Sequence, residues 1–80
     1  MYFTYILKSS INGTYYIGCT SNIDRRLKEH NKGTSKFTRK YRPWALVLEE
    51  KFETLGEARS RETYLKSWKK RERLEKLFNK

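Results

Sequence analysis

The dipeptide Asn12-Gly13 constrains the fold of this chain more than any other short feature. It separates two runs rich in β-branched and aromatic residues, residues 2–8 and residues 14–18. Asn-Gly between such runs is a strong signal for a hairpin turn, which joins two antiparallel strands. The first 18 residues are therefore predicted to form a β-hairpin.

Two helix-start signals follow the hairpin. The pattern Ser21-x-x-Asp24 predicts a helix from about residue 22 to residue 30, which should stop near Gly33. The pattern Thr54-x-x-Glu57 predicts a second helix.

The remaining segments complete the expected order of elements. Residues 34–43 are predicted to be a basic loop and residues 44–50 a third strand. The second helix is expected over residues 55–68, with a helical tail continuing toward Leu77. The order β-β-α-β-α(α) predicts an α+β fold, in which helices flank a small three-stranded antiparallel sheet.

The charge balance indicates the class of partner. Nineteen Lys and Arg residues oppose nine Asp and Glu residues, which gives a net charge of +10 on 80 residues. A chain of this length is expected to form one domain, over residues 1–80. Such a charge on one small domain is typical of proteins that bind polyanions. Because 15 % of the residues are aromatic and can stack on bases, nucleic acid is a more probable partner than an anionic lipid surface.

The composition argues against several other classes. Cys19 is the only cysteine, so an internal disulfide is impossible and a zinc site cannot be built with the single histidine. No apolar run approaches the roughly 18 residues that a membrane span needs, and the N-terminus lacks the basic region of a signal peptide. A cytoplasmic monomer is the simplest expectation.

Helical periodicity places polar residues where core residues belong. Residues in a helix advance by about 100° each, so Ile23 and Leu27 define the buried side of the first helix. His30 falls on the same stripe, and Arg26 flanks it. His30 is therefore either a packed core histidine or part of a site.

The second helix places a carboxylate among apolar residues. Glu62 lies on the stripe that Leu55, Ala58 and Leu65 define. A buried carboxylate costs several kcal/mol unless it is paired or bound to a metal. Two interpretations follow: Glu62 forms a structural ion pair with an arginine, or it is a metal ligand or a general acid/base.

The predicted strands add tyrosines. Alternation puts Phe3, Tyr5 and Leu7 on one face of the first strand, and it puts Tyr16 and Gly18 on one face of the second. A glycine near the end of a strand can mark a close approach to the backbone. Any one tyrosine could be a core residue, whereas the combination with Arg26, His30 and Glu62 suggests a site.

The ordered set Tyr5, Tyr16, Arg26, His30 and Glu62 resembles the GIY-YIG nuclease domain. The second half-motif, Tyr16-Ile17-Gly18, is intact, whereas residues 3–5, Phe-Thr-Tyr, keep only the tyrosine of the first. The resemblance covers nearly the whole chain and is closest to the short stand-alone bacterial members. It departs at Cys19, where some nucleases of the family carry a lysine, and in lacking a clear asparagine beyond the glutamate helix.

The resemblance implies hydrolysis of phosphodiester bonds with one Mg²⁺ or Mn²⁺ ion. Glu62 would be the metal ligand, and Arg26 would stabilise charge on the phosphate oxygens. Tyr16 would be the general base toward the attacking water. Tyr5 would hydrogen-bond to Tyr16 or the water, and His30 would orient Tyr5 or relay a proton.

Basic residues outside this set are candidates for binding the nucleic-acid backbone. The loop carries its cations among the aromatic residues Phe37, Tyr41 and Trp44, which can either stack on unpaired bases or fold back onto the core. The full set of candidate nucleic-acid-binding residues is Arg25, Lys36, Arg39, Lys40, Arg42, Lys69 and Lys70.

The hypothesis that best combines these features is a metal-dependent endonuclease that acts on DNA, including branched or damaged DNA. DNA is preferred over RNA as the substrate. One alternative is a catalytically weak nucleic-acid-binding module that keeps the fold. Another is a small adaptor that docks on a larger repair or ribosomal assembly through its basic surface and apolar tail.

Overall fold

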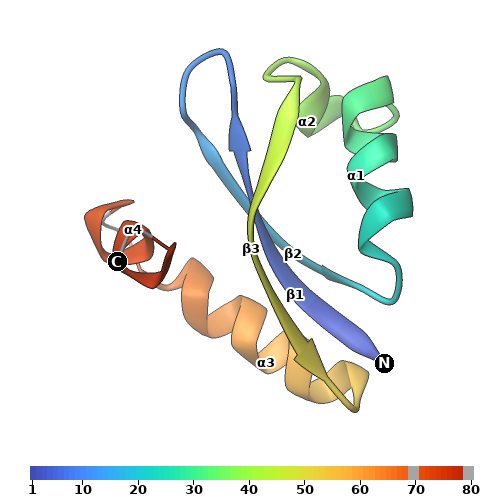
Figure 1. Ribbon diagram of the computed structural model, residues 1–80, viewed down its shortest axis with the longest axis vertical. Helices are drawn as coiled ribbons and strands as arrows, with labels where there is room; N and C mark the ends of the chain where they lie inside the picture. Colours follow the sequence, from blue (N-terminus) through green and yellow to red (C-terminus); the bar gives the residue numbers. More distant parts are fainter. Residues whose placement is uncertain (69–70, 79–80) are drawn as a thin grey trace.

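The computed structural model describes residues 1–68 and 71–78. Its elements, in chain order, are β1 (Tyr2–Ser9), β2 (Tyr15–Thr20), α1 (Ile23–Lys32), α2 (Lys36–Arg39), β3 (Trp44–Phe52), α3 (Leu55–Lys66) and α4 (Arg71–Phe78). This order confirms the predicted α+β class with its three strands and flanking helices (Figure 1).

The sheet is antiparallel and its strand order is β2-β1-β3, so β1 is central. Tyr5 pairs with Gly18 on one side and with Glu49 on the other. The predicted turn closes the hairpin: Gly13 has a φ of 75°, and the Asn12 side chain accepts a hydrogen bond from the Thr14 amide at 3.0 Å. Strand β2 is therefore an edge strand of the sheet.

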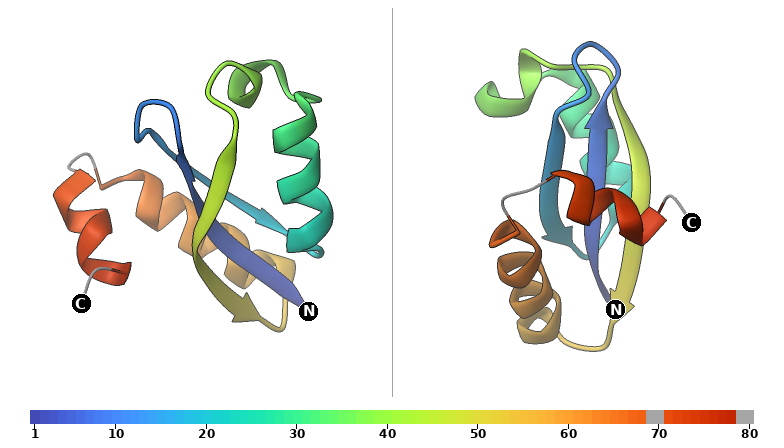
Figure 2. Two further views of the ribbon diagram at one scale, coloured as in Figure 1. Left: turned by 45° about the horizontal axis from the view of Figure 1, so that its top comes forward. Right: turned by 90° about the vertical axis from the view of Figure 1, so that its left-hand side faces the viewer.

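Helices cover both faces of this sheet (Figure 2). On the face of α1, the buried cluster contains Tyr5, Leu7, Ile23 and Trp44. On the opposite face, where α3 and α4 lie, it contains Ile6, Ile17, Leu65 and Leu74. Odd and even residues of β1 go to different clusters, which confirms the alternation predicted for this strand.

Helix α1 begins one residue later than its capping signal predicted. Asn22, and not Ser21, is the N-cap, and its Oδ1 accepts a hydrogen bond from the Arg25 amide at 3.0 Å. Thr20 holds Asn22 in place by accepting from its backbone amide at 3.1 Å. The helix ends at Gly33, as predicted, with a left-handed φ of 85°.

Three further expectations need correction. Residues 36–39 of the predicted loop form the short helix α2. Thr54 caps α3 by accepting from the Glu57 amide, but α3 ends at Lys66 and α4 is a separate helix. Leu55 is 36 % exposed, because it lies in the first turn of α3, so the apolar stripe rests on Ala58 and Leu65.

Side-chain hydrogen bonds fix the helices to the sheet. Asn31 of α1 both donates to the Trp44 carbonyl at 3.2 Å and accepts from the Trp44 amide at 2.6 Å. Thr4 of β1 donates to the Ala58 carbonyl of α3 at 2.7 Å. These bonds fix α1 to β3 and α3 to β1, on opposite faces of the sheet. Within the described ranges, no helix is both long and apolar enough to cross a bilayer.

Candidate active site

Three aromatic side chains of the predicted set lie together between the sheet and α1. The ring centroids of Tyr16 and His30 are 4.8 Å apart, and each ring lies 6.3 Å from that of Tyr5. Tyr5 and Tyr16 come from adjacent strands, and Gly18 makes room for them. A Cβ atom at Gly18 would lie 2.7 Å from the Tyr5 hydroxyl oxygen, so the neighbour that approaches this glycine is Tyr5 itself.

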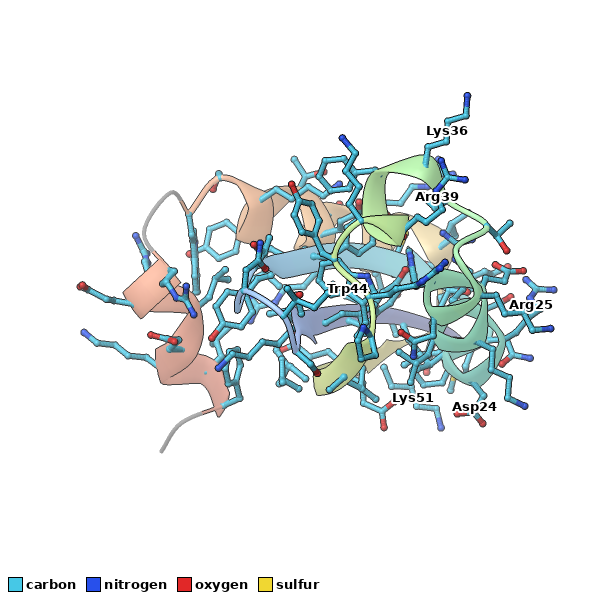
Figure 3. All side chains as sticks on the ribbon, turned by 90° about the horizontal axis from the view of Figure 1, so that it is seen from above. Asp24, Arg25, Lys36, Arg39, Trp44 and Lys51 are labelled. Atoms are coloured by element: carbon cyan, nitrogen blue, oxygen red, sulfur yellow. The ribbon has the colours of Figure 1, made fainter. Side chains whose placement is uncertain are left out.

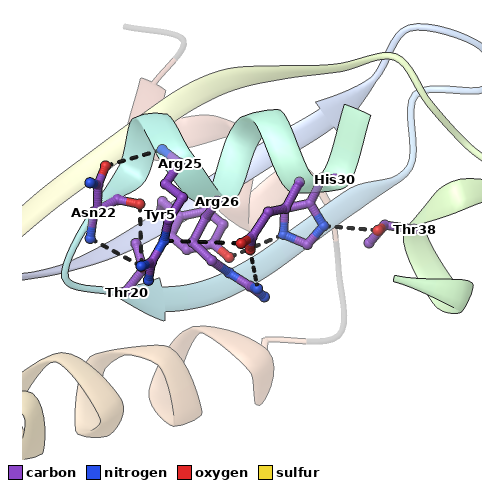
Figure 4. Close-up of polar contacts among 8 residues, drawn as sticks. Tyr5, Thr20, Asn22, Arg25, Arg26, His30 and Thr38 are labelled. Atoms are coloured by element: carbon purple, nitrogen blue, oxygen red, sulfur yellow. Dashed lines mark hydrogen bonds and ion pairs between the residues drawn. The ribbon is translucent and has the colours of Figure 1, made fainter. Parts of the chain in front are cut away.

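A chain of buried hydrogen bonds links β1, α1 and α2 (Figure 4). The Tyr5 hydroxyl lies 3.3 Å from His30 Nε2, and His30 Nδ1 lies 2.8 Å from the Thr38 hydroxyl. All three residues are at most 2 % exposed. Thr38 is held in turn because its carbonyl accepts from the Trp44 indole at 2.8 Å. Both ring nitrogens of His30 therefore have partners, which fixes the orientation of the ring.

Arg26 lies at the edge of this cluster, on the same side of α1 as His30. Its side chain is 36 % exposed and its Nη1 donates to Glu29 at 2.8 Å. The guanidinium also acts on the Tyr5 phenol, since each group shifts the pKa of the other. Arg26 thus lies between the buried Tyr5 and the solvent. Its guanidinium is exposed enough for an anion to reach it.

Burial sets the protonation of the two innermost groups. It raises the pKa of Tyr5 to about 12, although Arg26 acts in the opposite direction, so Tyr5 keeps its proton at neutral pH. Burial also lowers the pKa of His30, and the positive charge of Arg26 lowers it further. His30 is therefore neutral at pH 7, with one nitrogen donating and one accepting.

Glu62 lies on α3, across the edge strand β2 from the aromatic cluster. Its carboxylate pairs with Lys66 at 2.6 Å, one turn further along the helix. The alternative of an ion pair with an arginine is therefore not what the structure contains. Arg61, the neighbouring arginine, pairs instead with Glu50 at 2.7 Å. Glu62 is only 20 % exposed, which confirms its position near the buried stripe of α3.

The charge state of Glu62 reflects competing effects. Burial raises the pKa of this carboxyl, but hydrogen bonds from Lys66 and Cys19 and the positive charges of Lys66 and Arg59 outweigh burial, so its pKa is lowered. Burial and the contact with Glu62 raise the pKa of the Cys19 thiol, which is consequently neutral. Glu62 is thus an ionised carboxylate beside a neutral thiol and one lysine.

This donor set fits a hard divalent cation held by a single carboxylate. Mg²⁺ in proteins keeps several waters and often takes one or two carboxylates together with substrate phosphates. Among the residues that the structure describes, no three Asp, Glu, His or Cys side chains gather as a closed metal cage. Lys66 binds Oε2 of Glu62, so a cation would share the carboxylate with Lys66 or displace its ammonium.

The aromatic cluster and the Glu62–Lys66 pair influence one another around β2. The negative charge of Glu62 contributes to the raised pKa of Tyr5. The pKa of Lys66 is raised chiefly by its hydrogen bond to Glu62, and Tyr16 and Cys19 add to that rise. Charges on α3 thus act on Tyr5 of β1, and Tyr16 and Cys19 of β2 act on Lys66 of α3.

The predicted nucleic-acid-binding residues occupy the surface around α1 and α2. Figure 3 shows Arg25 extending outward from α1, and Lys36 and Arg39 from α2. Lys40 is also exposed, whereas Arg42 donates to the Lys32 carbonyl at the end of α1, at 3.3 Å. Lys69 and Lys70 lie outside the described residues.

The loop aromatics divide between the two alternatives considered for them. Trp44 is 3 % exposed and belongs to the core, and Tyr41 packs against the same cluster. Phe37 is 65 % exposed. Only Phe37 is therefore available for stacking from this loop.

Two residues of the site were not anticipated from the sequence. Lys66 could have been found, because it follows Glu62 at the i,i+4 spacing that favours ion pairs on helices. Thr38 has no such signal. Its contact with His30 depends on the short helix α2, which was predicted as an irregular loop.

Comparisons with known proteins agree with this geometry. A family model described as the GIY-YIG catalytic domain matches residues 1–76. A UPF0213 protein of Clostridium perfringens is 40 % identical over 81 residues, covering 100 % of this chain and 86 % of the relative. A UPF0213 protein of Staphylococcus aureus is 36 % identical over 74 residues, covering 91 % and 89 %.

A solved structure gives the same result. The solution NMR structure of a UPF0213 protein from Bacillus halodurans is similar with a TM-score of 0.59 at 33 % identity, covering 96 % of this chain and 83 % of that one. The match extends over both half-motifs, α1 and the glutamate helix. This chain therefore belongs to the GIY-YIG domain family, whose members are generally nucleases.

Proposed function

We propose that this protein is a metal-dependent endonuclease that hydrolyses phosphodiester bonds in DNA. The observation that carries the proposal is the cluster of Tyr5, Tyr16, His30 and Arg26 beside the edge strand β2, with Glu62 of α3 in contact with Cys19 of the same strand. A purely structural core does not need a cation, an ionised carboxylate and two hydroxyls at one edge of a sheet. Family membership supports a nuclease-type function with a divalent metal.

The two tyrosines have different environments and so different roles. Tyr5 is fully buried and keeps its proton, so it acts as a hydrogen-bond donor and not as a base. Tyr16 is half-buried and lines an open hollow beside Lys66, so its hydroxyl is the one that a water molecule can reach. We assign Tyr16 as the group that accepts the proton of the attacking water.

The remaining residues would orient the reacting groups and neutralise negative charge on the phosphate. Arg26 would donate to the non-bridging oxygens of the phosphate, where its planar fork matches two oxygens better than a lysine could. His30 holds the Tyr5 hydroxyl, and Thr38 holds His30. Glu62 would hold one Mg²⁺ or Mn²⁺ ion. When bound, that ion supplies charge neutralisation at the phosphate and the leaving oxygen.

The exposed cations would bind the DNA backbone. Arg25, Lys36, Arg39 and Lys40 extend the positive surface away from Arg26 without contributing to the buried cluster. Such contacts position the duplex or strand and carry no sequence information themselves. The proposed substrates include branched and damaged DNA. So small a surface leaves little room for reading sequence, so strong sequence specificity is not expected.

One observation favours a second candidate. Lys66 already neutralises Glu62 at 2.6 Å, and a protein in which that pair persisted would bind nucleic acid without cutting it. The two candidates make opposite predictions for the same experiment.

The test is cleavage of labelled duplex, single-stranded, flapped and branched DNA with Mg²⁺ or Mn²⁺, by the unmodified protein and by Glu62→Gln. The matched control is Glu50→Gln, which also removes a carboxylate paired with α3 but lies on β3. Metal-dependent cutting that only Glu62→Gln abolishes would support the nuclease. Intact binding without cutting in all three proteins would support the binding module.

A further inference from the structure

An open hollow of about 350 Å³ adjoins the candidate active site. Four aromatic side chains line it: Tyr15 and Tyr16 from β2, Phe37 from α2 and Trp68 from the segment after α3. Lys66 contributes its only charged group among the described residues. Its volume is within the range of pockets that hold small ligands or parts of larger ones.

The most exposed side chain of this aromatic hollow is Phe37. It is 65 % exposed, and its ring lies 6.2 Å from that of Tyr16. Trp68 is less available, because Arg73 lies 4.5 Å over its ring and Tyr64 packs against its edge. Tyr15 is also less available, because Arg71 lies 5.0 Å over its ring. Phe37 and Tyr16 therefore offer the accessible aromatic surface.

The lining residues suit a ligand that combines a flat aromatic ring with a negatively charged group. Aromatic faces stack on nucleobases of any sequence, and a lysine beside them suits a phosphate. Among the described residues that line the hollow, none is acidic. Lys36, next to Phe37 in the sequence, is exposed and adds to the positive surface of α2, in a chain whose net charge is +10.

We propose that the aromatic hollow binds an unpaired nucleobase, so that the substrate of this site is a nucleic acid with a single-stranded segment at the reacting phosphate. The hollow shares Tyr16 with the candidate site, and it shares Lys66 with the Glu62 ion pair. A base in an intact duplex has both faces covered by its neighbours, so it can enter only after it leaves the stack.

This inference rests on the proposed function, because it names the substrate of the same site. It is nevertheless tested separately, by measuring DNA binding in the presence of EDTA, where no metal-dependent cleavage occurs. The probe is a short single-stranded DNA with one 2-aminopurine, whose fluorescence falls on stacking, compared with the same strand annealed to its complement.

We expect the single strand to bind more tightly than the duplex, with quenching of the 2-aminopurine. Phe37→Ala should weaken single-strand binding by about 5- to 150-fold, the range for losing one stacked base, and leave duplex binding unchanged. Phe37→Trp should restore it. Ile11→Ala is the matched control, because Ile11 is also 65 % exposed but does not line the hollow.

Equal losses for single strand and duplex in Phe37→Ala, or no loss in either, would overturn the inference. If Phe37→Ala bound normally while the unmodified protein cut DNA, the inference would fail and the nuclease would stand. If stacking depended on Phe37 but no substrate was cut, the inference would stand and the nuclease would fail.

Discussion

The two faces of the sheet are built from the same strands and contain opposite kinds of interior. The face toward α3 and α4 is packed with aliphatic residues around Ile6, Ile17 and Leu65. The face toward α1 buries Tyr5, His30 and Thr38 in a chain of hydrogen bonds. The first face stabilises the fold chiefly by apolar burial, and its Thr4 hydroxyl is satisfied by one backbone carbonyl. The second face holds side chains whose hydrogen bonds depend on one another.

The largest effect on stability is expected on the aliphatic face. Leu65 is fully buried, so Leu65→Ala should lower the free energy of unfolding by about 2–5 kcal/mol, through lost burial and the cavity left behind. Urea denaturation followed by circular dichroism measures the loss. Leu55→Ala, at a 36 % exposed position of the same helix, is the control and should cost much less. Equal losses at the two positions would contradict the assignment of the core.

A smaller loss is expected when the polar face loses one hydroxyl. Thr38→Val keeps the shape but leaves His30 Nδ1 buried without its partner, which should cost about 1–3 kcal/mol of unfolding free energy. Thr34→Val, at an exposed position, should change stability by no more than about 0.5 kcal/mol. The same urea titration compares the two variants, and a neutral Thr38→Val would show that the hydrogen-bond chain contributes nothing.

The smallest effect is a pH dependence from His30, the only histidine. Its folded-state pKa is lowered, first by burial and then by Arg26. Between that lowered value and the ordinary value of about 6.5, the unfolded chain binds more protons than the folded one. Stability should therefore fall as the pH decreases from about 7 through this window.

Denaturation midpoints measured in steps from pH 7.5 to pH 5.5 would show this slope, and His30→Gln should remove it. A flat profile for the unmodified protein, or stability that rises on acidification, would contradict a buried neutral His30. The reference pKa values of Asp and Glu side chains are about 4, well below this range, so the slope near pH 6.5 is attributed to the histidine.

Periodicity predicted which face of the sheet or helix each residue lies on, but not the hydrogen-bond partners of the polar residues. Alternation in β1 assigned Tyr5 and Ile6 to opposite faces, and helical spacing placed His30 with Ile23, because both patterns depend only on local geometry. The contact between His30 and Thr38 joins residues eight apart through a turn and a short helix, which no period describes.

In the candidate site, too, the sequence predicted positions but not hydrogen-bond partners. The sequence singled out Glu62 as a misplaced carboxylate, yet its partner proved to be Lys66 and not an arginine. The capping pattern predicted Ser21 as the N-cap, but Asn22 is the N-cap in the structure. The Thr20 hydroxyl accepts from the Asn22 amide, a contact that the capping pattern does not include. Local rules thus predicted the three strands and the starts of α1 and α3, but not α2. The partners of the polar groups depended on tertiary packing.

The most direct test of the contrast between the faces is the single-turnover cleavage rate of Arg26→Ala, measured together with its unfolding free energy. Arg26 is 36 % exposed, so its removal should cost about 1 kcal/mol or less of stability. The cleavage rate should nevertheless fall by about 10²- to 10³-fold, as for loss of a group that stabilises transition-state charge. Lys28→Ala, an exposed position of the same helix, should keep its rate. An Arg26→Ala protein that cuts as fast as the unmodified one would contradict a catalytic role for this face.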